Sequence, residues 1–95
     1  MAVGIYFTPS LFTPDKYDES MRQLEATGAG WPDGCSHHVA LERNGEIQFL
    51  FDIWESQAAF EEFMARLSPI LTELGVDLGE PMVARVHNVG GCPGL

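Results

Sequence analysis

The chain of 95 residues is long enough for one domain with its own hydrophobic core and too short for two. Its 14 acidic and 5 basic residues give a net charge of −9, which excludes the cationic surface needed to bind nucleic acid or an anionic membrane. No apolar run has the length of a membrane span and no basic leader opens the chain, so we expect a soluble cytoplasmic protein.

The two cysteines, Cys35 and Cys92, are too few and too irregularly placed for a disulfide framework or a zinc site. We expect both to remain thiols and expect no metal. The sequence also has no glycine-rich phosphate loop, no HExxH motif of metalloproteases and no GxSxG nucleophile motif. Any chemistry must therefore come from a different kind of site.

The first part of the chain predicts a strand and then a helix. Residues 2–8 alternate between two faces, as in a strand with one buried side. Thr13-Pro14-Asp15 predicts a helix start, because Thr is a good N-cap, Pro fits the first turn and Asp faces the positive end of the helix dipole. This helix should span 14–27 and end at Gly28. The loop that follows carries Trp31, a large aromatic residue.

A hairpin lies in the middle of the chain. Asn44-Gly45, between apolar runs over 35–43 and 47–54, is a strong signal for a two-residue turn, and such a turn fixes the register of its strands. Counting outward, we predict one face with the pairs Arg43 and Glu46, Leu41 and Gln48, Val39 and Leu50, His37 and Asp52, Cys35 and Trp54. The other face should pair Ala40 with Phe49, His38 with Phe51, and Ser36 with Ile53.

A second helix follows at once, with Ser56 as its N-cap. Its apolar residues recur at helical spacing from Phe60 to Leu74, which predicts one face packed on the sheet. Pro69 lies inside this pattern and removes one backbone hydrogen bond, so we expect the helix either to kink after Ser68 or to restart at Ile70. Gly75 should end the helix.

The last strand is predicted over Met82–Val89, and 90–95 should form a flexible tail. The element order is then βαββαβ in a single domain over 1–95. This order predicts an α+β, ferredoxin-like fold: a four-stranded antiparallel sheet with both helices on one face.

The hairpin register predicts what each face of the sheet contacts. Ile47, Phe49, Phe51 and Ile53 should lie under the helices. The opposite face should carry an apolar patch too large for a monomer to expose, which predicts a homodimer with the two sheets face to face. The patch consists of Leu50, Trp54, Val39, Leu41 and Tyr6. On the last strand Met82, Ala84 and Val86 are expected in the core, which leaves Arg85 and His87 on the side that faces the partner. The residues predicted at the dimer interface are Tyr6, His37, Leu50, Asp52, Arg85 and His87.

Several segments resemble one family along the whole domain. The chain is similar to the dimeric α/β-barrel proteins of the antibiotic-biosynthesis-monooxygenase-like superfamily, and to its small stand-alone members without an assigned activity. The residues that carry the resemblance are Thr13-Pro14-Asp15-Lys16-Tyr17, His38-Val39-Ala40, Asp52-Ile53-Trp54-Glu55-Ser56 with Ala59-Phe60 and Phe63, Arg66-Leu67-Ser68-Pro69, and Val86-His87-Asn88.

The resemblance implies a pocket between sheet and helices. Better-known members oxygenate phenolic or anthrone-type aromatic molecules there without a cofactor, or bind and degrade haem. The haem-degrading members use an asparagine on the first strand and a histidine on the second helix beside the junction tryptophan. Trp54 matches, but neither of the other two residues is present. Haem binding is therefore a minor alternative.

His38 is the candidate catalytic residue, because an imidazole on the helix-covered face needs hydrogen-bonding partners. It is either a base in a pocket or a structural, hydrogen-bonded histidine. His37 opposite Asp52, and His87 near the end of the last strand, are expected as dimer contacts. The predicted pocket walls, each of which could instead be ordinary packing, are Trp54, Phe51, Phe63 and Trp31.

Two functions remain open at this point. The first is a protein that binds a small aromatic molecule and oxygenates it with no cofactor, with His38 as the base. The second is a non-catalytic dimeric module in which core and interface explain every aromatic residue. A pocket of about 300 Å³ or more that reaches His38 would favour the first, and a solid core there the second.

Overall fold

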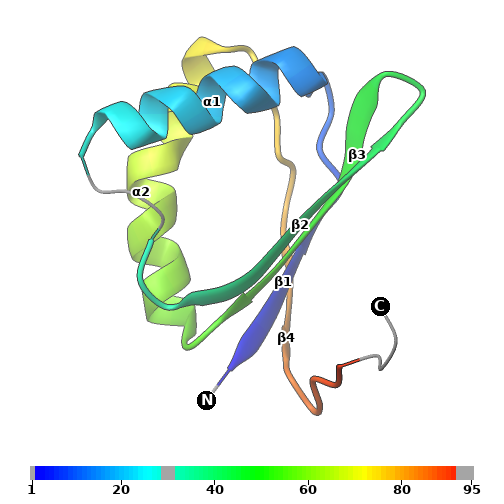
Figure 1. The fold of residues 1–95 in the computed structure, drawn as a ribbon, viewed down its shortest axis with the longest axis vertical. Helices are drawn as coiled ribbons and strands as arrows, with labels where there is room; N and C mark the ends of the chain where they lie inside the picture. Colours follow the sequence, from blue (N-terminus) through cyan, green and yellow to red (C-terminus); the bar gives the residue numbers. More distant parts are fainter. Residues whose placement is uncertain (1, 29–31, 92–95) are drawn as a thin grey trace.

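The computed structural model describes residues 2–28 and 32–91 of the chain. The elements, in chain order, are β1 (Val3–Phe7), α1 (Pro14–Ala26), β2 (Cys35–Arg43), β3 (Glu46–Trp54), α2 (Gln57–Glu73) and β4 (Met82–Arg85). The strands form one antiparallel sheet in the order β2-β3-β1-β4, and both helices lie over the same face of it (Figure 1). The predicted α+β, ferredoxin-like fold is confirmed.

Local sequence signals set the ends of the elements. The side chain of Thr13 accepts a hydrogen bond from the Lys16 backbone N–H, and that of Ser56 accepts one from Ala59, so both predicted N-caps are confirmed. At the hairpin, Asn44 and Gly45 have φ values of 56° and 78°. Two successive left-handed residues make the turn whose twist matches that of the strands it joins.

The hairpin register slips by one residue soon after this turn. Arg43 pairs with Glu46 and Glu42 with Ile47, but Leu41 pairs with Phe49 instead of the predicted Gln48. Gln48 is therefore an extra residue in β3, a β-bulge. Because side chains alternate along a strand, one inserted residue exchanges the faces of everything beyond it.

The bulge overturns most of the predicted face assignment for β3. Leu50, Asp52 and Trp54 lie on the helix-covered side and are buried, whereas the sequence placed them on the outer face. Phe51, 40% exposed, lies on the outer face, where it pairs with Val39 and Tyr6. The remaining corrections follow from the same slip: Phe49 pairs with Leu41 on the outer face, Ile53 pairs with Gly4 and His37 there, and only Ile47 keeps its place in the core.

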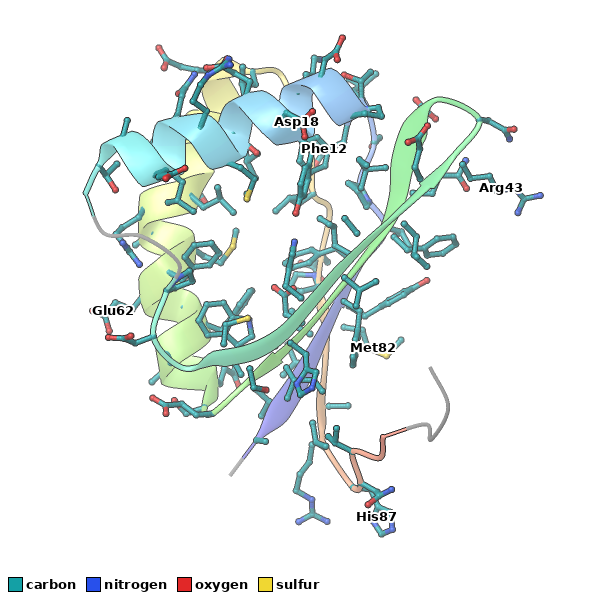
Figure 2. The ribbon with its side chains drawn as sticks, in the orientation of Figure 1. Phe12, Asp18, Arg43, Glu62, Met82 and His87 are labelled. Carbon is teal, nitrogen blue, oxygen red and sulfur yellow. The ribbon has the colours of Figure 1, made fainter. Side chains whose placement is uncertain are left out.

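The last strand is shorter than predicted, and its two faces are exchanged relative to the prediction. It ends at Arg85 rather than Val89, and its register sets Met82 opposite Tyr6 and Ala84 opposite Gly4. Met82 is 63% exposed and lies on the side of the sheet away from the helices (Figure 2), and Ala84 is exposed as well, so the expectation that they enter the core is wrong. These residues extend the outer apolar face of the sheet.

Helix α2 continues past Pro69 without a break and ends at Glu73, so the predicted restart at Ile70 does not occur. Its buried residues Phe60, Phe63, Leu67 and Leu71 pack on β1 and β3 and complete the core. Among the described residues, no helix combines the length and the apolar character required to cross a membrane.

We predict that Pro69→Ala will stabilise the protein. A proline in a helix interior is less favourable than alanine by about 3 kcal/mol, because it lacks the N–H and crowds the preceding turn. Pro69 is exposed, so no core contact offsets this. Urea denaturation should show a free energy of unfolding higher by up to about 3 kcal/mol.

Thr72→Ala in the same helix is the control, because Thr72 already has a backbone N–H and should change stability by less than about 1 kcal/mol. A loss of stability in Pro69→Ala would contradict the prediction and would mean that the core depends on the shape proline gives to α2.

Candidate functional site

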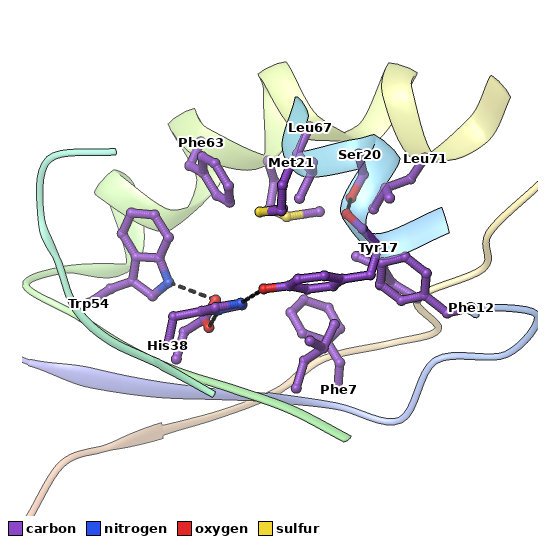
Figure 3. A pocket seen from close by; sticks show the side chains of 14 residues that line it. Phe7, Phe12, Tyr17, Ser20, Met21, His38, Trp54, Phe63, Leu67 and Leu71 are labelled. Atoms are coloured by element: carbon purple, nitrogen blue, oxygen red, sulfur yellow. Dashed lines mark hydrogen bonds and ion pairs between the residues drawn. The ribbon is translucent and has the colours of Figure 1, made fainter. Parts of the chain in front are cut away.

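A small cavity lies between the sheet and the two helices (Figure 3). Its volume is about 30 Å³, which is enough for a water molecule and not for an aromatic ring. The residues that line it are Phe7, Phe12, Tyr17, Ser20, Met21, His38, Leu50, Asp52, Trp54, Phe63, Met64, Leu67, Leu71 and Leu78. Most are apolar, so the few polar groups among them determine what the cavity can do.

Four of the lining side chains form one continuous chain of hydrogen bonds. The Tyr17 hydroxyl lies 2.6 Å from Nε2 of His38, and Nδ1 of the same ring lies 2.5 Å from Oδ1 of Asp52. The second carboxylate oxygen, Oδ2, accepts from the Trp54 indole N–H at 3.3 Å. Figure 3 shows the chain running from the indole across the imidazole to the phenol. Three elements, α1, β2 and β3, thus contribute to one polar cluster.

Because the cluster is buried, its polar groups must form hydrogen bonds with one another. The Asp52 residue is only 7% exposed, and a buried carboxylate without hydrogen bonds would carry a large desolvation penalty. The β3 bulge puts Asp52 on the same side as His38, directly opposite it in the ladder, and Trp54 follows two residues later. Both oxygens of the carboxylate are thereby hydrogen-bonded.

Tyr17 is fixed in place from several directions. Its ring stacks on His38 with the two planes 11° apart, and it contacts Phe12 on another side. The helix start at Thr13 puts Tyr17 in the first turns of α1, and the Ser20 hydroxyl donates to the Tyr17 carbonyl at 2.7 Å. The phenol therefore holds one orientation against the imidazole.

The direction of the hydrogen bonds follows from the proton on Tyr17. Burial, and next the negative charges of Asp52 and Asp18, raise the pKa of the Tyr17 phenol above its ordinary value of 10.0. The phenol thus stays protonated and can donate to Nε2 of His38, while Nδ1–H donates to Asp52. In this arrangement a proton that arrives at Tyr17 can pass to the imidazole, where the Asp52 carboxylate stabilises the resulting positive charge.

The structure puts three of the predicted site residues on the cavity wall: His38, Trp54 and Phe63. His38 faces the helices as predicted, but it pairs with Asp52 rather than with Phe51. Phe51 is on the outer face of the sheet, so its assignment as a pocket wall is wrong. Trp31 lies outside the described residues.

Of the residues predicted at the dimer interface, some face the cavity and the others lie outside it. Leu50 and Asp52 face the cavity, which is a correction with the β3 bulge as its cause. Tyr6 lies on the outer face of the sheet, and Arg85 and His87 line a groove beside it. His37 pairs with Ile53 rather than with Asp52 and is exposed, with its Nδ1 2.9 Å from the Ser36 hydroxyl.

The sequence pattern does not assign Tyr17 to the pocket, and it places Asp52 at the dimer interface instead of in the cavity. Tyr17 lies in the first turns of an N-capped helix, and a tyrosine at such a position gives no separate signal for chemistry. Asp52 had a usable signal, since an acidic residue in an otherwise apolar strand needs a buried partner. A register without a bulge gives Asp52 the partner His37, whereas the extra residue Gln48 brings it opposite His38.

The residues present do not fit a haem or a metal. His38 is the histidine on the cavity wall, and both of its ring nitrogens already contact Tyr17 and Asp52. Helix α2 has no histidine. Among residues 2–28 and 32–91, no group of three or more His, Cys, Asp or Glu side chains is arranged to hold a metal ion.

The Cys35 thiol donates to the His37 carbonyl oxygen at 3.3 Å. Cys92 lies outside the described residues, so the expectation of two thiols stays a prediction.

Comparison with protein-family models finds no match, and comparison with curated proteins finds none either. Solved structures are similar over nearly the whole chain. Protein YJCS superposes with a TM-score of 0.61 at 14% identity, covering 92% of this chain and 100% of the other. A candidate antibiotic biosynthesis monooxygenase from Chloroflexus aurantiacus gives a TM-score of 0.57 at 14% identity, with 96% and 98% covered.

SnoaB, a cofactor-independent oxygenase from Streptomyces nogalater, gives a TM-score of 0.54 at 18% identity, with 93% of each chain covered. At these identities the similarity shows a shared fold, and it confirms the fold-level resemblance seen in the sequence.

We predict that Tyr17 will titrate above its ordinary pKa of 10.0. The difference in tyrosinate absorbance between the native protein and Tyr17→Phe should have its midpoint above pH 10.0. Because the folded-state pKa is raised, the stabilisation linked to this group is fully present below pH 10.0 and is lost as the pH rises through the folded-state pKa. A midpoint of the difference signal at or below pH 10.0 would contradict the raised pKa.

Proposed function

We propose that this chain, which has the fold of the antibiotic-biosynthesis-monooxygenase-like proteins, binds a small uncharged aromatic molecule beside His38 and oxygenates it without a cofactor. The observation that carries the proposal is the Tyr17–His38–Asp52–Trp54 hydrogen-bonded chain on the wall of a mostly apolar cavity. The fold shared with SnoaB, a cofactor-independent oxygenase, supports the same reaction class.

The proton path follows from the hydrogen bonds. A ligand hydroxyl, or an acidic ring C–H, would give its proton to the Tyr17 oxygen while Tyr17 gives its own proton to Nε2 of His38. The imidazolium that forms lies against the Asp52 carboxylate, which stabilises it. His38 is thus the base, and Tyr17 is the group that touches the ligand.

The oxidation balances with dioxygen alone. A ring methylene of an anthrone-type molecule loses both hydrogens, one oxygen atom becomes the new carbonyl, and the other leaves as water. Removal of the first proton leaves an electron-rich anion that can reduce dioxygen directly. The role of the protein in this step is to stabilise that anion by taking up its proton and excluding bulk water.

One observation favours a second candidate, a non-catalytic dimeric module. The cavity of about 30 Å³ is some tenfold smaller than an ordinary ligand site of roughly 300 Å³ or more. In addition, every buried side-chain nitrogen and oxygen of the described residues has a hydrogen-bond partner. A polar cluster that is satisfied in this way could serve only to fix α1 on the sheet.

The decisive experiment is turnover of anthrone-type and flavonoid phenols under oxygen. We expect the native protein to consume dioxygen and His38→Ala to lose about 10²–10⁴-fold in rate, the usual contribution of a general base. His37→Ala is the matched control, because the neighbouring imidazole lies on the outer face and should leave the rate unchanged. If the native protein turns over no compound of the panel, the module is the better description.

We also propose that two copies of the chain associate through the outer faces of their sheets. This face exposes Val39, Leu41, Phe51 and Met82 at 45%, 54%, 40% and 63%. Tyr6 and Phe49 lie among them with their rings 5.9 Å apart. A continuous apolar patch of this kind on a sheet is usually covered by another sheet.

Sedimentation equilibrium tests the dimer. We expect a dimer for the native chain and a monomer for Phe51→Glu and Leu41→Glu, because each change puts a carboxylate into the apolar contact. Ala58→Glu adds the same charge at an exposed position of α2 and should leave the dimer intact. A monomeric native chain, or a dimer that survives both changes, would exclude this face as the interface.

A further inference from the structure

A groove on the protein surface lies next to the inner cavity, and one wall separates the two spaces. It runs between α2 and residues 76–81, the segment that leads from α2 to β4, and has a volume of about 310 Å³. This is the volume of a small-ligand site, which the inner cavity is not. Figure 1 shows the segment descending from the end of α2 toward the sheet.

The groove and the cavity share part of one wall. Phe7, Met64, Leu71 and Leu78 line both spaces, so these four side chains separate the surface from the Tyr17–His38 cluster. Phe7 and Leu71 are 4% exposed and belong to the core, whereas Met64 and Leu78 are half-buried at its edge. Of the four, Met64 has the longest and most flexible side chain.

The outer wall of the groove is firmly held. Ser10 and Asp77 exchange two backbone hydrogen bonds, of 2.8 and 3.3 Å, which tie the segment to the chain after β1. The Val76 N–H donates to the Leu71 carbonyl at 3.0 Å, and the Gly79 N–H donates to Oδ1 of Asp77 at 2.9 Å. The groove is therefore a formed feature, and on its inner wall Met64 and Leu78 are the residues that the core holds least tightly.

The lining indicates which ligands fit. It is apolar on the inside and carries the Ser68 and Thr72 hydroxyls and the Asp77 carboxylate. Among the described residues that line the groove, Asp77 is the one that carries a charge, and the chain has a net charge of −9, so an anion is disfavoured. A flat, uncharged molecule with a hydrogen-bond donor matches both the apolar floor and the oxygen atoms of the rim.

We propose that this groove is the outer part of the ligand site, and that Met64 is the side chain whose rotation joins it to the cavity beside Tyr17 and His38. Rotation of one unbranched thioether would extend a site of about 310 Å³ to the hydrogen-bonded cluster. This inference rests on the proposed function for the identity of the inner end. The groove as a binding site does not depend on turnover.

Binding is tested with N-phenyl-1-naphthylamine, an uncharged aromatic probe that fluoresces in apolar surroundings. We expect saturable binding by the native protein and a loss of about tenfold or more in affinity in Thr72→Phe, whose new ring occupies the groove. Glu73→Phe is the control, because the adjacent residue is exposed and does not line the groove. Equal binding by all three proteins overturns the groove as the site.

The role of Met64 is tested by quenching of Trp54 with acrylamide, in a Trp31→Phe background that leaves Trp54 as the only tryptophan. Trp54 is 1% exposed and lines the inner cavity as well as a second pocket near Cys35, so the change in its quenching caused by a substitution at Met64 reports access from the groove. We expect Met64→Ala to increase the quenching constant several-fold and Met64→Leu, which keeps the volume but not the flexibility, to lower it.

Thr72→Phe should lower the quenching in the Met64→Ala protein, since it blocks the groove. Unchanged quenching in all of these variants would show that the groove does not lead to the cavity, whether or not the protein has an oxygenase activity. Circular dichroism confirms that each variant is folded.

Discussion

The buried carboxylate of Asp52 constrains the centre of this structure. An ionisable group with so little contact to water must have hydrogen-bond donors on its own side of the sheet, and His38 and Trp54 supply them. The imidazole in turn needs a partner at its second nitrogen, which fixes the place of Tyr17 and with it the first turns of α1. The packing of a helix on the sheet and the polarity of the cavity thus have one physical origin.

Much of the fold was accessible from the sequence because it depends on local signals. The N-caps at Thr13 and Ser56, the Asn44-Gly45 turn and the two spacing patterns each act within a few residues, and together they predict the element order. The choice of faces on β3 was not accessible in this way. A single extra residue at Gln48 decides it, and a bulge gives no sign in the pattern when both faces of the strand are apolar.

The candidate site illustrates the same division. His38 was identified because a polar side chain on a covered face always requires an explanation, and this holds whichever residue lies opposite. Its true partners depend on the register and on the packing of α1, which are tertiary features. The register slip in β3 moves Leu50 and Trp54 from the outer face of the sheet to the helix-covered face. Phe49 and Phe51 take their places on the outer face, which therefore stays apolar.

The two edges of the sheet have a consequence for how copies of the chain can associate. At one edge β4 is only four residues long, and at the other edge β2 has its own irregularity between Cys35 and His37. Short or distorted edges offer few backbone groups in line for another strand, so growth from edge to edge into open fibrils is disfavoured. The association proposed above uses the outer face instead, where a two-fold contact would close on itself and stop.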